Sequence, residues 1–283
     1  GVRSGTSPFF SNNKEVTMRR PFPILLAALL LASPAAFAQK TASQGIDEYR
    51  AMLQDGNPAE LFEAKGEALW KQKRGPKNAS LEKCDLGKGP GVVKGAFVEL
   101  PRHFADTGRV QDLESRLLTC METLQGLNAA EIAKTPFGRG EQNNMTALAT
   151  WIAAESQGMR FALPNSHPQE KVFYEVGKRL FFQRGGAHDF ACASCHGEEG
   201  KRIRLQDLPN LTKNPGDGVG FAAWPAYRVS NGQMWGMQQR LNDCYRQQRF
   251  PYPGFASDAT IALAMYLGVN SQGSKSIAPA IKR

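Results

Sequence analysis

The feature that most constrains this chain is the segment 191–197, Ala-Cys-Ala-Ser-Cys-His-Gly. Cys192 and Cys195 lie three positions apart, and His196 follows directly. This spacing is the attachment signature of c-type haem, in which two thiols add to the porphyrin vinyl groups and the imidazole ligates iron. The alternatives are a redox dithiol or half of a zinc site, but zinc needs a second pair of ligands at similar spacing, and the sequence has none. We therefore expect one covalently bound haem c with His196 as the proximal iron ligand.

The N-terminal segment has the pattern of a secretory signal peptide. A basic start at residues 18–20 precedes an apolar run at 24–31 and a small-x-small cleavage site at 36–38. The apolar run is too short to span a bilayer. Residues 1–38 are therefore interpreted as an upstream extension and signal peptide, and the mature chain is expected to begin near Gln39. This predicts a periplasmic protein with no membrane span in its mature form, with a retained anchor as the alternative.

Charge and cysteine count narrow the partners and the compartment. Without residues 1–38 the chain keeps 31 basic and 25 acidic side chains, a net charge of +6. No segment resembles a nucleic-acid-binding module, so a small anion or an acidic protein is the expected partner rather than nucleic acid. Two of the five cysteines belong to the haem motif. The remaining three, Cys84, Cys120 and Cys244, need a role in an oxidising compartment.

Three blocks of sequence recur in the same order in the two halves of the chain. They are residues 61–72 and 172–183, residues 116–120 and 240–244 (both Arg-Leu-x-x-Cys), and residues 147–152 and 262–267. Generic similarity between amphipathic helices explains the first and third pairs in part, but not the cysteine block. The pattern indicates an internal duplication.

Helical periodicity recurs in both halves, and little of the chain alternates with a period of two. Helices are expected over residues 58–73, 110–124, 143–156, 169–183, 233–248 and 257–267. We predict an all-α fold of two tandem cytochrome-c-like domains, residues 39–160 and 161–283, of which only the second carries haem. By analogy with that fold, Gly177 and Tyr266 suit a close crossing of its first and last helices.

The duplication predicts a disulfide in the first half. The offset of 111 that aligns residues 61–72 with 172–183 places Leu81 opposite Cys192, Cys84 opposite Cys195 and Asp85 opposite His196. The first half therefore cannot attach haem. Cys84 and Cys120 should approach each other where the haem would lie, and we expect them to form a disulfide.

The same comparison predicts the distal iron ligand. Cys120 lies near the first half's lost haem site, so its counterpart Cys244 is expected over the iron, where a thiolate lowers the potential. A surface thiol or an intermolecular disulfide is the other role open to Cys244. The competing ligands are methionines and histidines: Met234, Met237, Met265, His188 and His167.

Arg240 lies one helical turn before Cys244, so both side chains can face one cavity. A guanidinium there would bind a small oxyanion in a bidentate manner. The alternatives are a solvated helix arginine or a partner for a haem propionate. Arg116 occupies the equivalent position in the first half, which favours an inherited structural role.

The chain resembles the SoxA family, the catalytic subunits of the SoxAX cytochromes of periplasmic sulfur oxidation. The resemblance is carried by residues 192–197, by Asn231-Gly232-Gln233, by Gln239-Arg240 followed by Cys244, and by Tyr252-Pro253. Some members carry haem in both halves. Leu81 and Asp85 depart from those members, so this chain is similar to the single-haem form.

The resemblance implies an activity and partners. Family members oxidatively join thiosulfate to a cysteine of the carrier protein SoxYZ, and electrons leave through haem with the small cytochrome SoxX as partner subunit. By match, Cys244 is the haem ligand and the site of a persulfide or transient sulfur adduct. Arg240 would hold the sulfonate of thiosulfate.

Three other functions stay open. A thiosulfate dehydrogenase that makes tetrathionate also pairs haem with cysteine ligation, but generally carries a second haem. A plain periplasmic electron-transfer cytochrome c would use Met234 or Met237 as ligand and would not need Arg240. The third is a non-catalytic haem-binding interaction subunit.

Overall fold

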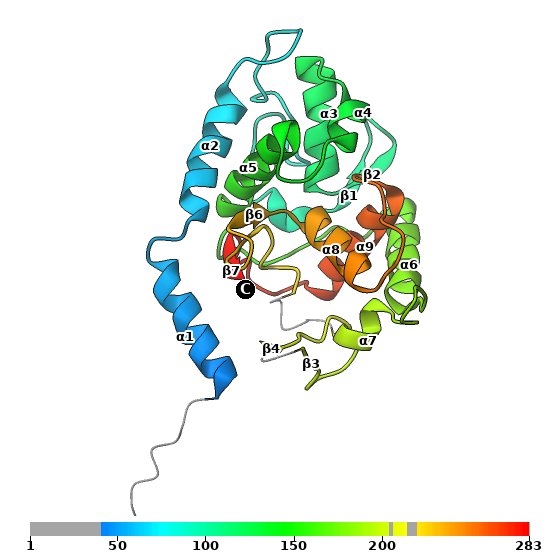
Figure 1. Cartoon of the computed structure of the whole chain (residues 1–283). Helices are drawn as coiled ribbons and strands as arrows, with labels where there is room; N and C mark the ends of the chain where they lie inside the picture. Colours follow the sequence, from blue (N-terminus) through cyan, green and yellow to red (C-terminus); the bar gives the residue numbers. More distant parts are fainter. Residues whose placement is uncertain (1–40, 204–205, 214–219, 283) are drawn as a thin grey trace, which may run out of the picture. The chain divides into compact units, whose positions relative to one another are not determined.

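The computed structural model describes residues 41–203, 206–213 and 220–282, and Figure 1 gives its elements in chain order. The expected signal peptide and mature start near Gln39 lie outside these residues. In the first half the elements are α1 (Ala42–Gln54), α2 (Ala59–Lys71), a 3₁₀ turn (Phe97–Glu99), β1 (Arg102–Phe104), β2 (Arg109–Gln111), α3 (Leu113–Gln125), α4 (Ala129–Lys134) and α5 (Gly140–Ala154). In the second half they are α6 (Pro168–Phe182), α7 (Cys192–His196), β3 (Arg202–Ile203), β4 (Gln206–Asp207), β5 (Ala226–Arg228), β6 (Gln233–Trp235), α8 (Met237–Gln247), α9 (Asp258–Asn270) and β7 (Ala280–Lys282).

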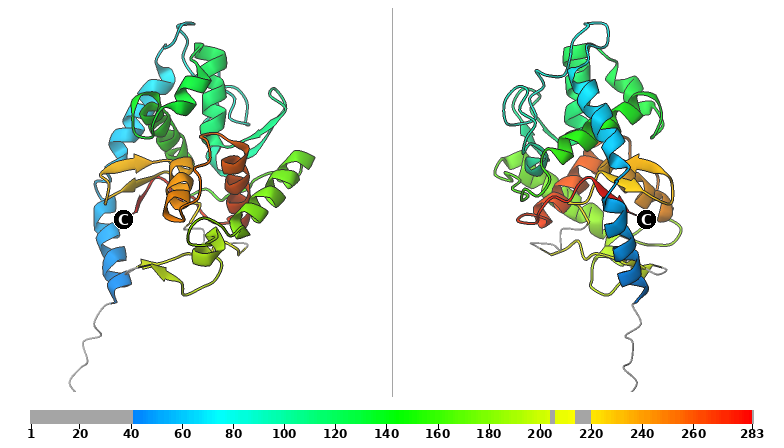
Figure 2. Two further views of the ribbon diagram at one scale, coloured as in Figure 1. Left: turned by 45° about the vertical axis from the view of Figure 1, so that its right-hand side comes forward. Right: turned by 90° about the vertical axis from the view of Figure 1, so that its left-hand side faces the viewer.

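Short strands are the main departure from the all-α expectation. Each has two or three residues, too few to produce a recognisable period of two. β1 pairs with β2 and β5 with β6, both antiparallel, and β7 adds to β5 in parallel. The helix expected over residues 233–248 begins at Met237, because residues 233–235 pair with β5 instead. Figure 2 shows the β5–β6 hairpin leading into α8.

Each half contains a pair of crossed helices, α2 with α5 and α6 with α9 (Figure 1). Glycine permits the close approach in both pairs. A Cβ on Gly66 would overlap the carbonyl oxygen of Ala147, and a Cβ on Gly177 would overlap that of Ala262. Aromatic rings complete both crossings, with centroids 5.6 Å apart for Trp70–Trp151 and 5.1 Å for Phe181–Tyr266.

The two halves share one hydrophobic core. At their junction, the ring of Phe161 lies edge-on to Phe97 from the first half and packs at a similarly steep angle against Phe221 from the second, each at 5.5 Å. Cys84 and Cys120 form a buried disulfide within the first half, with their Cα atoms 5.6 Å apart. Within the described ranges, no helix has the length and apolar character needed to cross a membrane.

A buried polar contact fixes α8 against the first half. The N-cap residue Gly236 has no side chain to cap the helix, and Glu114 from α3 takes that role by accepting a hydrogen bond of 3.0 Å from the backbone N–H of Gln238. The Gln238 side chain donates to Asp112 at 2.8 Å and accepts from the backbone N–H of Ala256 at 2.6 Å. Burial raises the pKa of Asp112, and burial together with the Asp112 carboxylate raises that of Glu114 to about 8.

The disulfide should stabilise the fold by closing a long loop. The two cysteines are separated by 36 positions, and the chain-entropy model gives about 4 kcal/mol for a loop of that length. The double variant Cys84→Ala/Cys120→Ala should lose about that free energy of unfolding in urea titration while keeping its haem absorbance. An unchanged urea midpoint under non-reducing conditions would contradict the prediction.

Glu114 should make stability fall as pH rises. The unfolded chain releases this proton near pH 4.5, whereas the folded protein holds it until about pH 8. The contribution of Glu114 is therefore complete below about pH 4.5 and is lost as pH rises towards 8. Glu114→Gln keeps an acceptor oxygen but cannot ionise.

The variant should therefore lose less free energy of unfolding than the wild type between pH 5 and pH 8. Urea midpoints at four pH values in this interval would measure the difference. Glu122→Gln, on the exposed face of the same helix, is the control and should follow the wild type. Parallel curves for wild type and Glu114→Gln would refute the prediction.

Candidate functional site

The expected site residues meet at one cavity. Cys192, Cys195 and His196 reach it from α7, and Arg240 and Cys244 reach it from α8. The cavity opens to solvent and is lined mainly by apolar atoms, as the macrocycle of a haem requires.

Local hydrogen bonds shape the motif into the short helix α7. The Ser194 hydroxyl accepts from the backbone N–H of Ala191 at 3.0 Å, and the N–H of Gly197 donates to the carbonyl of Ala193 at 2.8 Å. This turn brings the thiols of Cys192 and Cys195 to the wall of the cavity. Both are free and partly buried in the structure.

His196 has the geometry of an iron ligand. Its Nδ1 lies 2.9 Å from the carbonyl oxygen of Pro209, which can only accept, so Nδ1 carries the proton. Nε2 then has the lone pair that an iron ligand needs, and the ring orientation is fixed, as it is in most metal-binding histidines. The carbonyl of His196 also accepts from the N–H of Leu211 at 2.9 Å, which holds residues 209–211 beside the motif.

The environment of Cys192 favours a thioether over a metal thiolate. Burial, with a smaller contribution from Cys244, raises the pKa of its thiol to about 12. The Gln248 side chain donates a long hydrogen bond to its sulfur, at 3.9 Å. Among the described residues, no group of three or more His, Cys, Asp or Glu side chains could hold a metal ion such as zinc, whereas a thioether carries no charge to solvate. The residues present therefore fit covalent haem.

Arg240 and Cys244 lie one turn apart on α8 and both line the cavity, as the sequence predicted. Arg240 donates to Asp243 at 3.0 Å, and its guanidinium carbon lies 5.7 Å from the ring centre of Trp224. Asp243 also accepts from Arg246 and Gln247, at 2.7 and 2.8 Å. The carboxylate is thus shared, and it orients Arg240 without using all of its donors.

The competing iron ligands separate into two groups. Met237 lines the cavity with Cys244. The others lie elsewhere: Met234 is buried on β6, Met265 is buried in α9, His188 is exposed near Phe190, and His167 stacks on His103 with ring centres 3.7 Å apart. The structure therefore leaves a thiolate and one thioether as candidates for the distal position.

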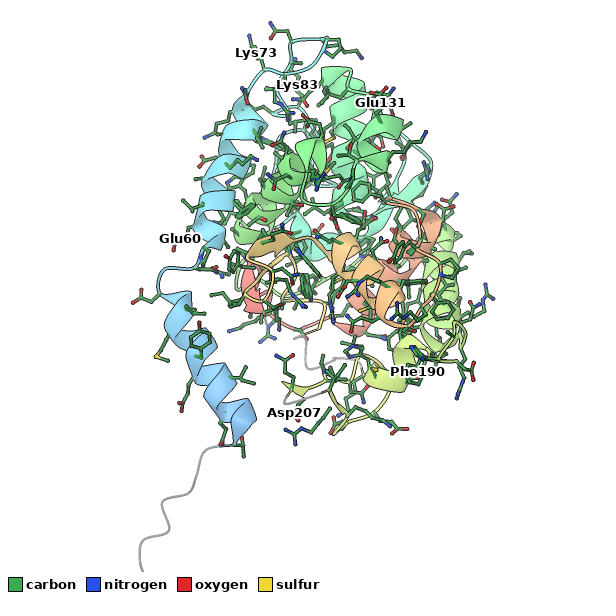
Figure 3. All side chains as sticks on the ribbon, in the orientation of Figure 1. Glu60, Lys73, Lys83, Glu131, Phe190 and Asp207 are labelled. Atoms are coloured by element: carbon green, nitrogen blue, oxygen red, sulfur yellow. A yellow bond between two sulfur atoms is a disulfide. The ribbon has the colours of Figure 1, made fainter. Side chains whose placement is uncertain are left out.

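Sequence reasoning missed several residues at this site. Pro209 and Gln248 contact His196 and Cys192, and Arg228 at the end of β5 lines the cavity with Arg240. The β3–β4 hairpin also lines it, and its residue Asp207, labelled in Figure 3, pairs with Arg202 at 2.9 Å. Only Arg228 had a possible signal in the sequence. When Cys120 is aligned with Cys244, this charged residue stands at the position of the apolar Phe104.

Known proteins with similar sequences and folds agree on one family. A model described as "SoxA/TsdA, cytochrome c domain" matches residues 65–161, the half without the haem motif. The L-cysteine S-thiosulfotransferase subunit SoxA of Hydrogenophilus thermoluteolus is 55% identical over 240 residues, 85% of this chain and 88% of that protein. A protein of the same name from Hydrogenobacter thermophilus is 32% identical over 266 residues, 92% of this chain and 97% of that protein.

The fold has a match among solved structures. The crystal structure of SoxXA from P. pantotrophus aligns with a TM-score of 0.69 at 24% identity, covering 83% of this chain and 84% of that chain. The alignments cover 88% and 97% of these two relatives, and the cavity is lined by five of the residues that carried the resemblance: Cys192, Cys195, His196, Arg240 and Cys244. The chain therefore belongs to the SoxA family.

Proposed function

We propose that this chain is the SoxA subunit of an L-cysteine S-thiosulfotransferase. Acting with a SoxX-type cytochrome c subunit, it joins thiosulfate to a cysteine of the carrier protein SoxYZ. The outer sulfur of thiosulfate and the cysteine sulfur enter as two thiolates, one S–S bond forms, and two electrons leave. The observation that carries the proposal is the convergence of Arg240, Cys244 and the haem-attachment motif on one cavity.

Four residues would hold the haem. Cys192 and Cys195 would form the thioethers, and His196 (through Nε2) and Cys244 would ligate the iron. When bound, the haem would supply a one-electron carrier, so the two released electrons would pass one at a time to the SoxX-type cytochrome. Cys244 is also the sulfur centre of the reaction, carrying a persulfide or a transient adduct.

Arg240 orients the substrate. Its guanidinium, held by Asp243, offers further N–H donors towards the cavity, which suits a sulfonate. Binding the sulfonate places the outer sulfur of thiosulfate towards Cys244, one helical turn away. Arg116 shows what a purely structural arginine at this position looks like. Its Nε donates to the carbonyl of Asp85 at 2.6 Å, and its Nη1 pairs with Asp106 at 2.8 Å. Arg240 makes no such hydrogen bond to a backbone carbonyl of the described residues, and it lines the cavity.

We further propose that the chain is a duplication with domains 39–160 and 161–283 and a single haem in the second. The matching glycine crossings and paired hairpins support this division. In the first half Leu81 is fully buried, and Asp85 accepts from the N–H groups of Gly87 and Gly89 at 2.7 and 2.9 Å. Both residues thus have structural roles where the second half has haem ligands.

We place the mature protein in the periplasm after cleavage of a signal peptide near Gln39. The Cys84–Cys120 disulfide supports an oxidising compartment.

Cys244 should be required for conjugation and should determine the haem spectrum. Cys244→Ala should lower turnover of thiosulfate with SoxYZ by on the order of 100-fold or more, because the sulfur centre is gone. It should also remove the low-spin thiolate signal from electron paramagnetic resonance spectra. Mass spectrometry of the wild-type peptide that contains Cys244 would test for one added sulfur.

Met237→Leu is the matched control, because Met237 lines the same cavity. It should keep both the thiolate signal and the turnover. If Met237→Leu alone changes the spectrum, the protein uses a thioether ligand and the electron-carrier function applies. Tetrathionate formation from thiosulfate without SoxYZ would instead identify a thiosulfate dehydrogenase.

Arg240 should act mainly on substrate binding. Arg240→Gln should raise KM for thiosulfate about 10- to 100-fold, since a charge-assisted hydrogen bond contributes roughly 1.5–3 kcal/mol. Steady-state kinetics with SoxYZ would measure the change. Arg246→Gln is the control, because Arg246 shares the Asp243 carboxylate from an exposed position. Equal effects of the two substitutions would show that Arg240 acts only through Asp243.

A further inference from the structure

Arg228 is a second guanidinium at the cavity that contains Cys244. It ends strand β5, is partly buried, and lines the same cavity as Arg240. Its Nε is buried with no hydrogen-bond partner, and its Nη2 has only a long contact of 3.5 Å with the Ser230 hydroxyl. The guanidinium carbon lies 4.8 Å from the ring centre of Trp235. An arginine in this setting retains donors for a further partner.

Groups of both signs lie near Arg228. Burial, with Arg240 nearby, lowers the pKa of Arg228, whereas Asp243 and Cys244 act in the opposite direction. The Asp243 carboxylate is already used by Arg240 and Arg246. Among the residues that the structure describes, no ion pair is formed by Arg228. A partly buried guanidinium without an ion pair, close to a second guanidinium, favours an anion between them.

The hairpin of the first half, β1–β2, has an uncharged residue at the position that Arg228 occupies in the hairpin β5–β6. The two hairpins match in register: Phe104 pairs with Arg109, and Arg228 pairs with Gln233. The shift that aligns Cys120 with Cys244 places Phe104 opposite Arg228 and Asp106 opposite Ser230. In the first half the Phe104 ring lies 4.0 Å beneath the guanidinium carbon of Arg116, and Asp106 neutralises it.

The second half therefore has a cation in place of that ring and a hydroxyl in place of that carboxylate. Arg240 nevertheless has a carboxylate partner, because Asp243 pairs with it as Asp106 pairs with Arg116. The guanidinium of Arg228 is therefore the additional positive charge of the second half, and an additional cation suits an anionic ligand.

We propose that Arg228 and Arg240 together hold the sulfonate end of thiosulfate, and that Arg228 selects dianions over monoanions. This rests on the proposed function, because it assigns the substrate of that cavity. The guanidinium groups of Arg228, Arg240 and Arg246 and the carboxylate of Asp243 carry a combined charge of +2 (3 − 1), which a dianion balances, whereas a monoanion leaves one positive charge without a partner. Small tetrahedral dianions such as sulfate should therefore compete with thiosulfate, and nitrate should not.

Calorimetric titration of the haem-loaded complex with the SoxX-type subunit tests this without turnover. Thiosulfate, sulfate and nitrate are the probes. Arg228→Gln should raise the Kd of thiosulfate and sulfate about 10- to 100-fold and leave weak nitrate binding unchanged. In assays with SoxYZ it should raise KM while kcat stays within about twofold. The haem spectrum and midpoint potential should not move.

Two further variants guard against a purely structural effect. Arg228→Lys keeps the charge but not the planar fork, and should recover part of the dianion affinity. Arg246→Gln, exposed on α8, should bind all three anions as the wild type does.

Other outcomes separate the two proposals. Unchanged dianion affinity in Arg228→Gln overturns the role of Arg228, and a shifted potential with unchanged affinity assigns this residue to a haem propionate instead. If the wild type binds sulfate through Arg228 but does not conjugate thiosulfate to SoxYZ, the anion site stands and the proposed function fails.

Discussion

The arrangement of the site depends on one buried contact between the halves of the chain. α8 carries both Arg240 and Cys244, yet it begins at a glycine that cannot cap it. The carboxylate of Glu114 supplies the missing acceptor, and the Gln238 side chain extends this contact to Asp112 and Ala256. A helix held at its first turn is fixed in position and rotation. The half without a haem motif thus positions the helix that carries Arg240 and Cys244.

The two helices that carry Arg-Leu-x-x-Cys, α3 and α8, have different surroundings. Around α3, the Cys84–Cys120 disulfide and the hydrogen-bonded side chain of Arg116 stabilise the fold, and Leu81 is fully buried. Around α8, the corresponding cysteine is free and the corresponding arginine faces a cavity. Satisfied polar groups produce a rigid domain, whereas unsatisfied ones remain available to bind a substrate.

Much of this could be predicted from sequence because it is local. The six expected helices are present, and their ends differ from expectation by a few residues. Gly177 was expected at a helix crossing by analogy with the cytochrome c fold, and the structure shows the same close approach at Gly66. The short strands could not be predicted, since β5 is defined by its pairing with residues 233–235 and 280–282 rather than by its own three residues. Because residues 233–235 pair with β5, α8 begins at Met237 rather than at residue 233 as expected.

The sequence by itself determined that Cys192, Cys195 and His196 have the spacing for haem attachment, that Cys84 and Cys120 pair, and that Arg240 and Cys244 share a helix face. Those conclusions follow from spacing along the chain, which the helical period converts into direction. Only the tertiary structure decided what surrounds them. Pro209 contacts His196 and Glu114 caps α8 across distant segments of the chain, and Arg228 lines the same cavity as Arg240. The charge and burial at the site arise from those contacts, which no local pattern encodes.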